Sequence, residues 1–210
     1  MRDVHTTNLD ESCMMASGGI IKVLGCAGKN KHENNISGYR FSVTTVRVGS
    51  AAGVDGPRVY LAKGERLKQT TMKRFGRGEH DHHPAPEGTF IEMTPNAYMT
   101  EQAWKNINPK LCKGMRKMKG VRDGLWMVLS MGGFGSHLKE SALHIFSDHM
   151  IIVVKEEGDT SQVSQAYDQT VAKNNKKFTC EMLDKYKFHT THVMNQWELI
   201  LIINTALDSH

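Results

Sequence analysis

The chain has 210 residues, of which 39% are hydrophobic and 23% are charged, and its formal net charge is +5. This length is enough for one sizeable α/β domain, and the composition is that of an ordinary soluble protein. No uncharged apolar run reaches the roughly 18 residues that a membrane-spanning helix needs, and the N-terminus lacks the apolar core of a secretory signal. We therefore expect an intracellular protein without a membrane segment.

The cysteines form no metal-binding or disulfide pattern. Cys13, Cys26, Cys112 and Cys180 lie far apart in the sequence, and no C-x-x-C pair occurs. This spacing argues against a zinc ribbon and against a disulfide framework. We expect reduced thiols.

The first half of the chain predicts an antiparallel meander of strands. A short segment at 4–10 is followed by β-branched and apolar runs at 19–24, 39–48 and 59–62, which are separated by turns rich in glycine and asparagine. Charges, histidines and prolines then dominate residues 63–99. That stretch predicts an insertion or a long loop.

The second half predicts alternating helices and strands. Thr100 can cap a first helix, and a buried strand at 124–131 leads into the glycine-rich turn 132–137. A further strand is expected at 149–154, and helical spacing returns at 158–169. Alternation of this kind requires parallel strands joined by crossover connections. The helix after the turn should place one apolar face on the sheet, formed by Leu138, Ala142, Ile145 and Phe146.

The order of elements predicts an α/β fold of the RNase H-like type, in which an antiparallel meander precedes parallel β-α-β-α units with flanking helices. We expect residues 1–188 to form this domain and 189–210 to form a C-terminal helical tail. The tail carries an apolar stripe that either packs on the domain or meets a partner. Its members are Val193, Trp197, Ile200, Leu201 and Leu207.

Three short motifs occur in an order that carries a family resemblance. Residues 8–12 read Asn-Leu-Asp-Glu-Ser, residues 132–137 read Gly-Gly-Phe-Gly-Ser-His, and residues 165–168 read Gln-Ala-Tyr-Asp. Taken together they resemble the DDE superfamily endonuclease domain of pogo, Tigger and centromere-protein-B-like elements, which are related to mariner transposases. The spacing between the last two positions, 168 − 132 = 36 residues, suits that family.

The resemblance implies a site for metal-dependent cleavage of DNA strands. Asp10 and Asp168 correspond to the first and third catalytic acids, which would bind Mg²⁺ or Mn²⁺. Gly132 stands where the family has its second Asp. Hard oxygen ligands suit these cations, which activate water and polarise phosphate. The positions that support the site in the family correspond to Glu11, Ser136 and His137.

Gly132 departs from the family at a position that decides catalysis. Removing one preorganised stabiliser of transition-state charge lowers rates by on the order of 10²–10³, so we expect activity to be weak or absent. Asp123 and Asp148 precede the parallel strands and should lie at their amino ends, away from the site. Asp159 lies on the correct side, but its spacing to Gln162 is typical of a helix cap.

Basic residues are concentrated between positions 105 and 122, where no acid interrupts them. Such a run is in many proteins only a solvated surface. In a chain with a net positive charge it also favours a polyanion partner, which we expect to be DNA bound without sequence preference. The residues are Lys105, Lys110, Lys113, Arg116, Lys117, Lys119 and Arg122.

Three functional hypotheses follow from the sequence. The leading one is a transposase-derived domain that binds nucleic acid in the nucleus and is catalytically impaired. The second is an active metal-dependent endonuclease with a rearranged site. The third is a protein-interaction module that does not bind DNA, and a homodimer is compatible with all three.

Overall fold

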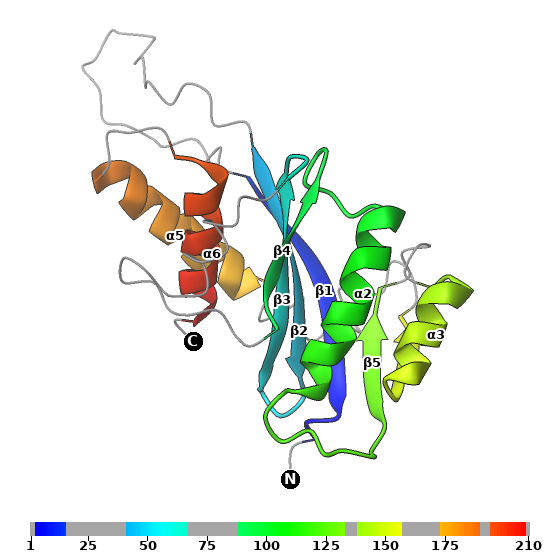
Figure 1. Ribbon diagram of the computed structural model, residues 1–210. Coiled ribbons are helices and arrows are strands. Elements are labelled where there is room, and N and C mark those ends of the chain that lie inside the picture. The colour runs from blue at the N-terminus through cyan, green and yellow to red at the C-terminus, as the bar shows by residue number, and fades with distance from the viewer. Residues whose placement is uncertain are drawn as a thin grey trace, which may run out of the picture.

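The computed structural model describes residues 3–15, 41–66, 88–132, 138–156, 173–189 and 194–208. Within these ranges the chain forms an α/β structure, a six-stranded mixed sheet with helices on both faces (Figure 1). The strand expected at 19–24 and the helical spacing expected at 158–169 lie outside the described residues.

The strands are β1 (Thr6–Met15), β2 (Ser42–Ser50), β3 (Asp55–Lys63), β4 (Phe90–Thr94), β5 (Met127–Met131) and β6 (Ile151–Lys155). The described helices are α2 (Glu101–Arg116), α3 (Glu140–Asp148), α5 (Lys173–His189) and α6 (Gln196–Asp208).

The strands lie in the order β4-β3-β2-β1-β5-β6. β1, β2 and β3 pair in antiparallel fashion, whereas β5 runs parallel to β1, and β6 runs parallel to β5. The predicted meander followed by parallel strands is therefore confirmed at the level of a mixed α/β sheet. β1 joins the two halves, because it pairs with β2 on one side and with β5 on the other.

One strand was not predicted. β4 runs parallel to β3 at the edge of the sheet, inside the stretch 63–99 that the sequence presented as an insertion or long loop. Its five residues follow a proline-rich and charged segment, and so short a run gives little periodic signal. Only Ile91 and Thr94 of β4 are buried, so the strand is recognisable mainly from its pairing with β3.

The first face of the sheet is covered by α2 and α3, and we call it the α2 face. Thr100 caps α2, since its hydroxyl oxygen accepts a hydrogen bond of 3.1 Å from the Ala103 N–H. The side chains that α2 buries recur at helical spacing and face the sheet. They are Trp104, Ile107, Leu111 and Met115.

α3 packs on the same face as the sequence predicted. Ala142 and Phe146 are buried in the core beside Trp104, while Leu138 and Ile145 are partly buried against it. The rings of Trp104 and Phe146 lie 6.2 Å apart at a tilt of 45°, a favourable arrangement for two aromatic side chains. This contact joins α2, which packs against β3 and β4, to α3, which packs against β6.

The opposite face carries α6 and α5, and we call it the α6 face. Figure 1 shows these two helices across the sheet from α2 and α3. α6 packs its apolar residues against β2 and β3, where Val43, Tyr60 and Ala62 are fully buried. Trp197 and Leu201 of the predicted stripe are partly buried in this cluster. Of the two alternatives for the stripe, packing on the domain is the one observed.

A buried arginine ties α6 to the sheet. Arg58 on β3 is only 1% exposed, and its guanidinium contacts Asp55 at 2.6 Å and Asp208 of α6 at 2.7 Å. It also donates a hydrogen bond of 3.0 Å to the side-chain oxygen of Asn204. Arg47 on β2 binds the other oxygen of Asp55 at 2.6 Å, so two buried cations face two carboxylates.

Tyr60 completes this network. Burial raises the pKa of Tyr60, so the phenol stays neutral and donates a hydrogen bond of 3.0 Å to the same Asn204 oxygen. Burial lowers the pKa of Arg58, but Tyr60, Asp55 and Asp208 raise it by more, and the pKa lies above its ordinary value. The arginine is therefore charged at every pH at which the protein folds.

We predict that Arg58→Met destabilises the protein by about 3 kcal/mol, because removing one partner of a buried ion network leaves carboxylates without their compensating charge. Urea denaturation would measure the change in the free energy of unfolding. Lys177→Met removes an exposed charge on α5 and should change that free energy by less than about 0.5 kcal/mol. Equal effects of the two substitutions would contradict the role of Arg58 in holding α6 on the sheet.

Candidate functional site

The pairing of β1 defines a distinct edge of the sheet. β1 pairs with β2 from Thr7↔Ser50 to Met15↔Ser42, at the end of the strand, but its pairing with β5 ends at Leu9↔Met131. Asp10 is thus the first residue of β1 beyond the parallel ladder. The sequence predicted that the first strand ends near Asp10. β1 instead continues to Met15, and only its pairing with β5 stops just before Asp10.

Gly132 and Glu156 occupy the same position on the two neighbouring strands. β5 pairs with β6 up to Met131↔Lys155, so both residues come directly after the last paired residue of a parallel strand. Continuing the register by one residue places Asp10, Gly132 and Glu156 in one row across β1, β5 and β6. We call these three residues the edge row. They lie at the carboxyl ends of parallel strands, where α/β sheets usually bind ligands.

The edge row lies on the α6 face of the sheet rather than on the α2 face. Leu9 and Met131 are buried in the core under α2, and neighbouring residues of a strand point to opposite faces. Asp10 on β1 therefore points to the α6 face, as does Asn8 two residues before it. Glu11 points to the α2 face, so it does not lie beside Asp10 as a second carboxylate.

Glu156 is held by two side chains of the adjacent strands. Asn8 donates a hydrogen bond of 2.9 Å from Nδ2 to Glu156 Oε1, and the Ser130 hydroxyl donates to the same oxygen. The Glu156 N–H donates to the Met131 carbonyl at 3.0 Å, which fixes the backbone. The carboxylate thus reaches across β5 toward β1.

Two oxygen atoms beside this contact are buried without a hydrogen-bond partner within the described ranges. They are Glu156 Oε2 and Asn8 Oδ1. Leaving a buried acceptor unpaired costs about 1–3 kcal/mol, so such atoms indicate a place where a further donor or a cation fits. Carboxylate and amide oxygens are ligands that hard divalent cations prefer.

Two of the predicted site positions, Asp10 and Gly132, lie within the described residues at the end of the parallel ladder. Asp10 follows Leu9 and Gly132 follows Met131, and Leu9↔Met131 is the last pair of the ladder between β1 and β5. Asp168, Ser136 and His137 lie outside the described residues. Among the described residues no group of three or more His, Cys, Asp or Glu side chains could hold a metal ion.

Glu156 was missed in the sequence. The signal was present, because an acid directly after a parallel strand should lie at the same edge as Gly132. Its identification required the register of β6 against β5, which the sequence did not supply. Asp123 and Asp148, by contrast, precede β5 and β6 as expected and lie toward the opposite edge.

The predicted basic residues divide into two groups. Lys105 and Lys110, before the last turns of α2, form ion pairs with Glu101 at 3.1 Å and with Glu92 at 3.8 Å. Lys110 also lies 4.9 Å from the centre of the Phe90 ring. Their charges are partly balanced, so they contribute less to the surface potential than the sequence indicated.

The second group surrounds the end of α2. Arg116 is a structural residue, since its guanidinium donates hydrogen bonds to the backbone carbonyls of Leu125 at 2.8 Å and Arg122 at 3.0 Å. It fixes the turn between α2 and β5, and the remaining basic side chains of the last turn of α2 and of this turn are exposed. We call these residues the basic turn, and they are Lys113, Lys117, Lys119 and Arg122.

The basic turn and the edge row lie at opposite edges of the sheet. The turn leads into the amino end of β5, whereas Gly132 follows its carboxyl end. Five residues of strand separate them, or about 16 Å. The two features also belong to different faces, because α2 lies across the sheet from the side to which Asp10 points.

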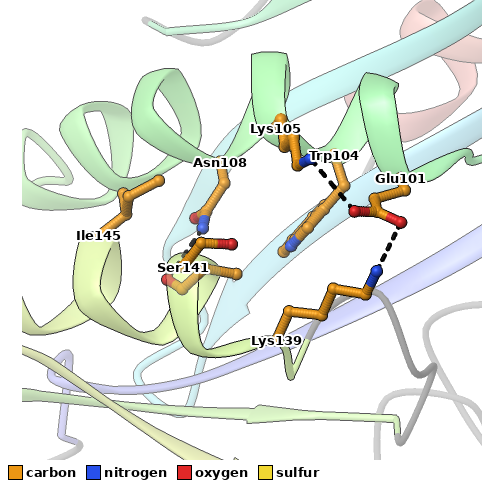
Figure 2. Close-up of a pocket in the computed structure, with 8 residues that line it drawn as sticks. Glu101, Trp104, Lys105, Asn108, Lys139, Ser141 and Ile145 are labelled. Atoms are coloured by element: carbon orange, nitrogen blue, oxygen red, sulfur yellow. Dashed lines mark hydrogen bonds and ion pairs between the residues drawn. The ribbon is translucent and has the colours of Figure 1, made fainter.

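A pocket of about 100 Å³ lies between α2 and α3. Its lining is largely apolar and includes Trp104, Ala142 and Ile145. Figure 2 shows Lys105 and Lys139 reaching Glu101 at its mouth, at 3.1 Å and 2.6 Å. The hydrogen bonds from the two lysines lower the pKa of Glu101. That carboxylate is therefore ionised and engaged, and it is unsuited to proton transfer near neutral pH.

The buried thiol beneath α2 is also unsuited to catalysis. Burial raises the pKa of Cys112 to about 12, so it carries no thiolate at neutral pH. Its Sγ donates to Asn108 Oδ1 at 3.2 Å, and Asn108 donates to the Ala142 carbonyl at 3.2 Å. These bonds join α2 to α3 and give the thiol a packing role.

No family model matches the chain, and no curated protein matches it. None of the described helices is both long enough and apolar enough to cross a membrane. The function therefore has to be inferred from the geometry of the site itself.

Proposed function

We propose that this chain is a nucleic-acid-binding domain with an RNase H-like fold, derived from a DDE transposase and catalytically impaired at Gly132. The observation that carries the proposal is the position of Asp10 and Gly132. Each follows a member of the last pair between β1 and β5, Leu9↔Met131, and this is the edge where the first two acids of such a site are expected. The strand order β3-β2-β1-β5-β6, with α2 between its antiparallel and parallel parts, supports the same fold.

The proposed impairment follows from what each position contributes. Asp10 offers a carboxylate, Gly132 offers no side chain, and Asp168 is the expected third ligand. Mg²⁺ or Mn²⁺, when bound, would polarise a phosphate and lower the pKa of a water molecule. The residues of this chain would position that cation with one carboxylate fewer than the family uses, which lowers the rate by on the order of 10²–10³ or more.

The proposed partner is DNA, and the proposed location is the nucleus. The basic turn exposes several cations on a rigid turn, and Arg116 holds that turn in place. Phosphate neutralisation by such a cluster favours binding without base readout. Because the turn lies about 16 Å from the edge row, this binding does not depend on an intact acid site.

We predict that duplex DNA binds with an affinity that falls steeply with salt, and that the substitution of Lys113, Lys119 and Arg122 by Gln reduces the slope. Each lost phosphate contact should lower the magnitude of the slope of log affinity against log salt by about 0.9. Fluorescence anisotropy with duplexes of two unrelated sequences at several salt concentrations would measure it.

The matched control removes the same charge from α5. Lys176, Lys177 and Lys185 are exposed there, and their substitution by Gln should leave the slope nearly unchanged. If both triple variants reduced the slope equally, binding would be a general effect of net charge. If the unchanged protein showed no affinity at low salt, a protein-interaction module would replace the proposal.

We further predict that Gly132→Asp raises both the affinity for Mn²⁺ and metal-dependent nicking of plasmid DNA. The new carboxylate would stand between Asp10 and Glu156 in the edge row and add a hard oxygen ligand. Calorimetric titration with Mn²⁺ and a plasmid-nicking assay on both proteins would test this. Strong, equal nicking by both would show that Gly132 is not a lost acid, and no gain in binding would show that the site has decayed further.

A further inference from the structure

The geometry of the edge row points to a second protein ligand for the cation. We propose that Glu156, beside the vacant position of Gly132, is a second protein ligand, so that Asp10 and Glu156 hold one divalent cation between them while the carboxylate expected at position 132 stays absent. This inference rests on the proposed function, because it takes Asp10 as part of a metal site.

The register provides the room for such a site. Neighbouring strands lie about 4.8 Å apart, so Asp10 and Glu156, two strands apart, have Cα atoms separated by about 10 Å. Gly132, the residue directly after β5, lies between them and has no side chain. Both acids belong to the α6 face, because Asp10 alternates with Leu9 and because Glu156 contacts Asn8.

Two hydrogen bonds fix the carboxylate of Glu156 and leave its second oxygen without a described partner. Asn8 and Ser130 both donate to Oε1, which fixes the carboxylate across β5. The other oxygen, Oε2, is buried and accepts no hydrogen bond from any described residue. A cation at this position would satisfy it at little cost, because the side chain is already oriented.

Asn8 provides a third oxygen. Its Nδ2 is committed to Glu156, and this orients the amide so that Oδ1, which is also buried and without a described partner, is available. Two carboxylates and one amide oxygen form a donor set suited to Mg²⁺, Mn²⁺ or Ca²⁺ and poorly suited to softer metals.

Arg47, a cation on the strand next to Asp10, shares its charge with Asp55. Arg47 is the register partner of Asp10 on β2, and its guanidinium binds Asp55 Oδ1 through Nε at 3.1 Å and Nη2 at 2.6 Å. Asp55 is also the partner of Arg58, which in turn contacts Asp208 of α6.

The test is the affinity of the whole protein for Mn²⁺ in the absence of DNA, measured by calorimetry and by the spin-resonance signal of free Mn²⁺. Glu156→Gln keeps an acceptor for Asn8 and Ser130 but removes the charge. We expect the affinity to fall at least tenfold, since even residues that only orient metal ligands cost about 10–100-fold when changed. Ser130→Ala should give a smaller loss, and Asp10→Asn a loss similar to that of Glu156→Gln.

Glu140→Gln is the control, because Glu140 is an exposed acid at the start of α3 and its loss should leave Mn²⁺ affinity unchanged. Thermal unfolding in EDTA checks that each variant is folded. If Glu156→Gln does not fold, Glu156→Asp retains the charge with a shorter side chain and should still weaken binding.

The outcomes separate this inference from the proposal on which it rests. Loss of binding in Asp10→Asn with no change in Glu156→Gln would overturn the role of Glu156 and leave the acid site standing. Absence of Mn²⁺ binding in the unchanged protein would overturn the inference too. DNA affinity measured in EDTA would then decide the proposed function by itself.

Discussion

The divided pairing of β1 is the constraint on which the rest of the structure depends. β1 pairs with β2 as far as Met15, at the end of the strand, but with β5 only as far as Leu9, so the sheet opens beside Asp10. The antiparallel half continues past this point, and the parallel half stops. A half-buried carboxylate on the central strand is tolerated there because the neighbouring strand no longer covers it.

The α6 face divides into two regions of different chemistry. Over β2 and β3, Arg47 and Arg58 are neutralised by acids and covered by α6, which gives a closed and charge-balanced region. Over β5 and β6, no described element covers the strands, and Ile152 and Val154 are 49% and 46% exposed. The edge row lies at the end of this more open region, where a ligand can approach.

The sequence predicted the elements that periodicity and capping define. Thr100 marked the start of α2, and the apolar spacing of Ala142 and Phe146 marked the buried face of α3. It missed β4, whose five residues are recognisable only from their pairing with β3. It could not predict Glu156 as a site residue, because adjacency across strands depends on register, and register is set by the whole sheet. The ion pairs of Arg58 could not be predicted either, because its partner Asp208 lies 150 residues further along the chain and meets it only in the folded protein.

The ion pair between Arg58 and Asp208 of α6 limits where the chain can be shortened. A protein ending before Gln196 would keep every strand, yet it would uncover the apolar cluster of Val43 and Tyr60 and leave the guanidinium facing water on one side and Asp55 on the other. Newly exposed apolar surface beside sheet strands favours self-association. α6 therefore covers part of the hydrophobic core and is an integral element of the fold. A shortened chain that omits α6 should be recovered as aggregates.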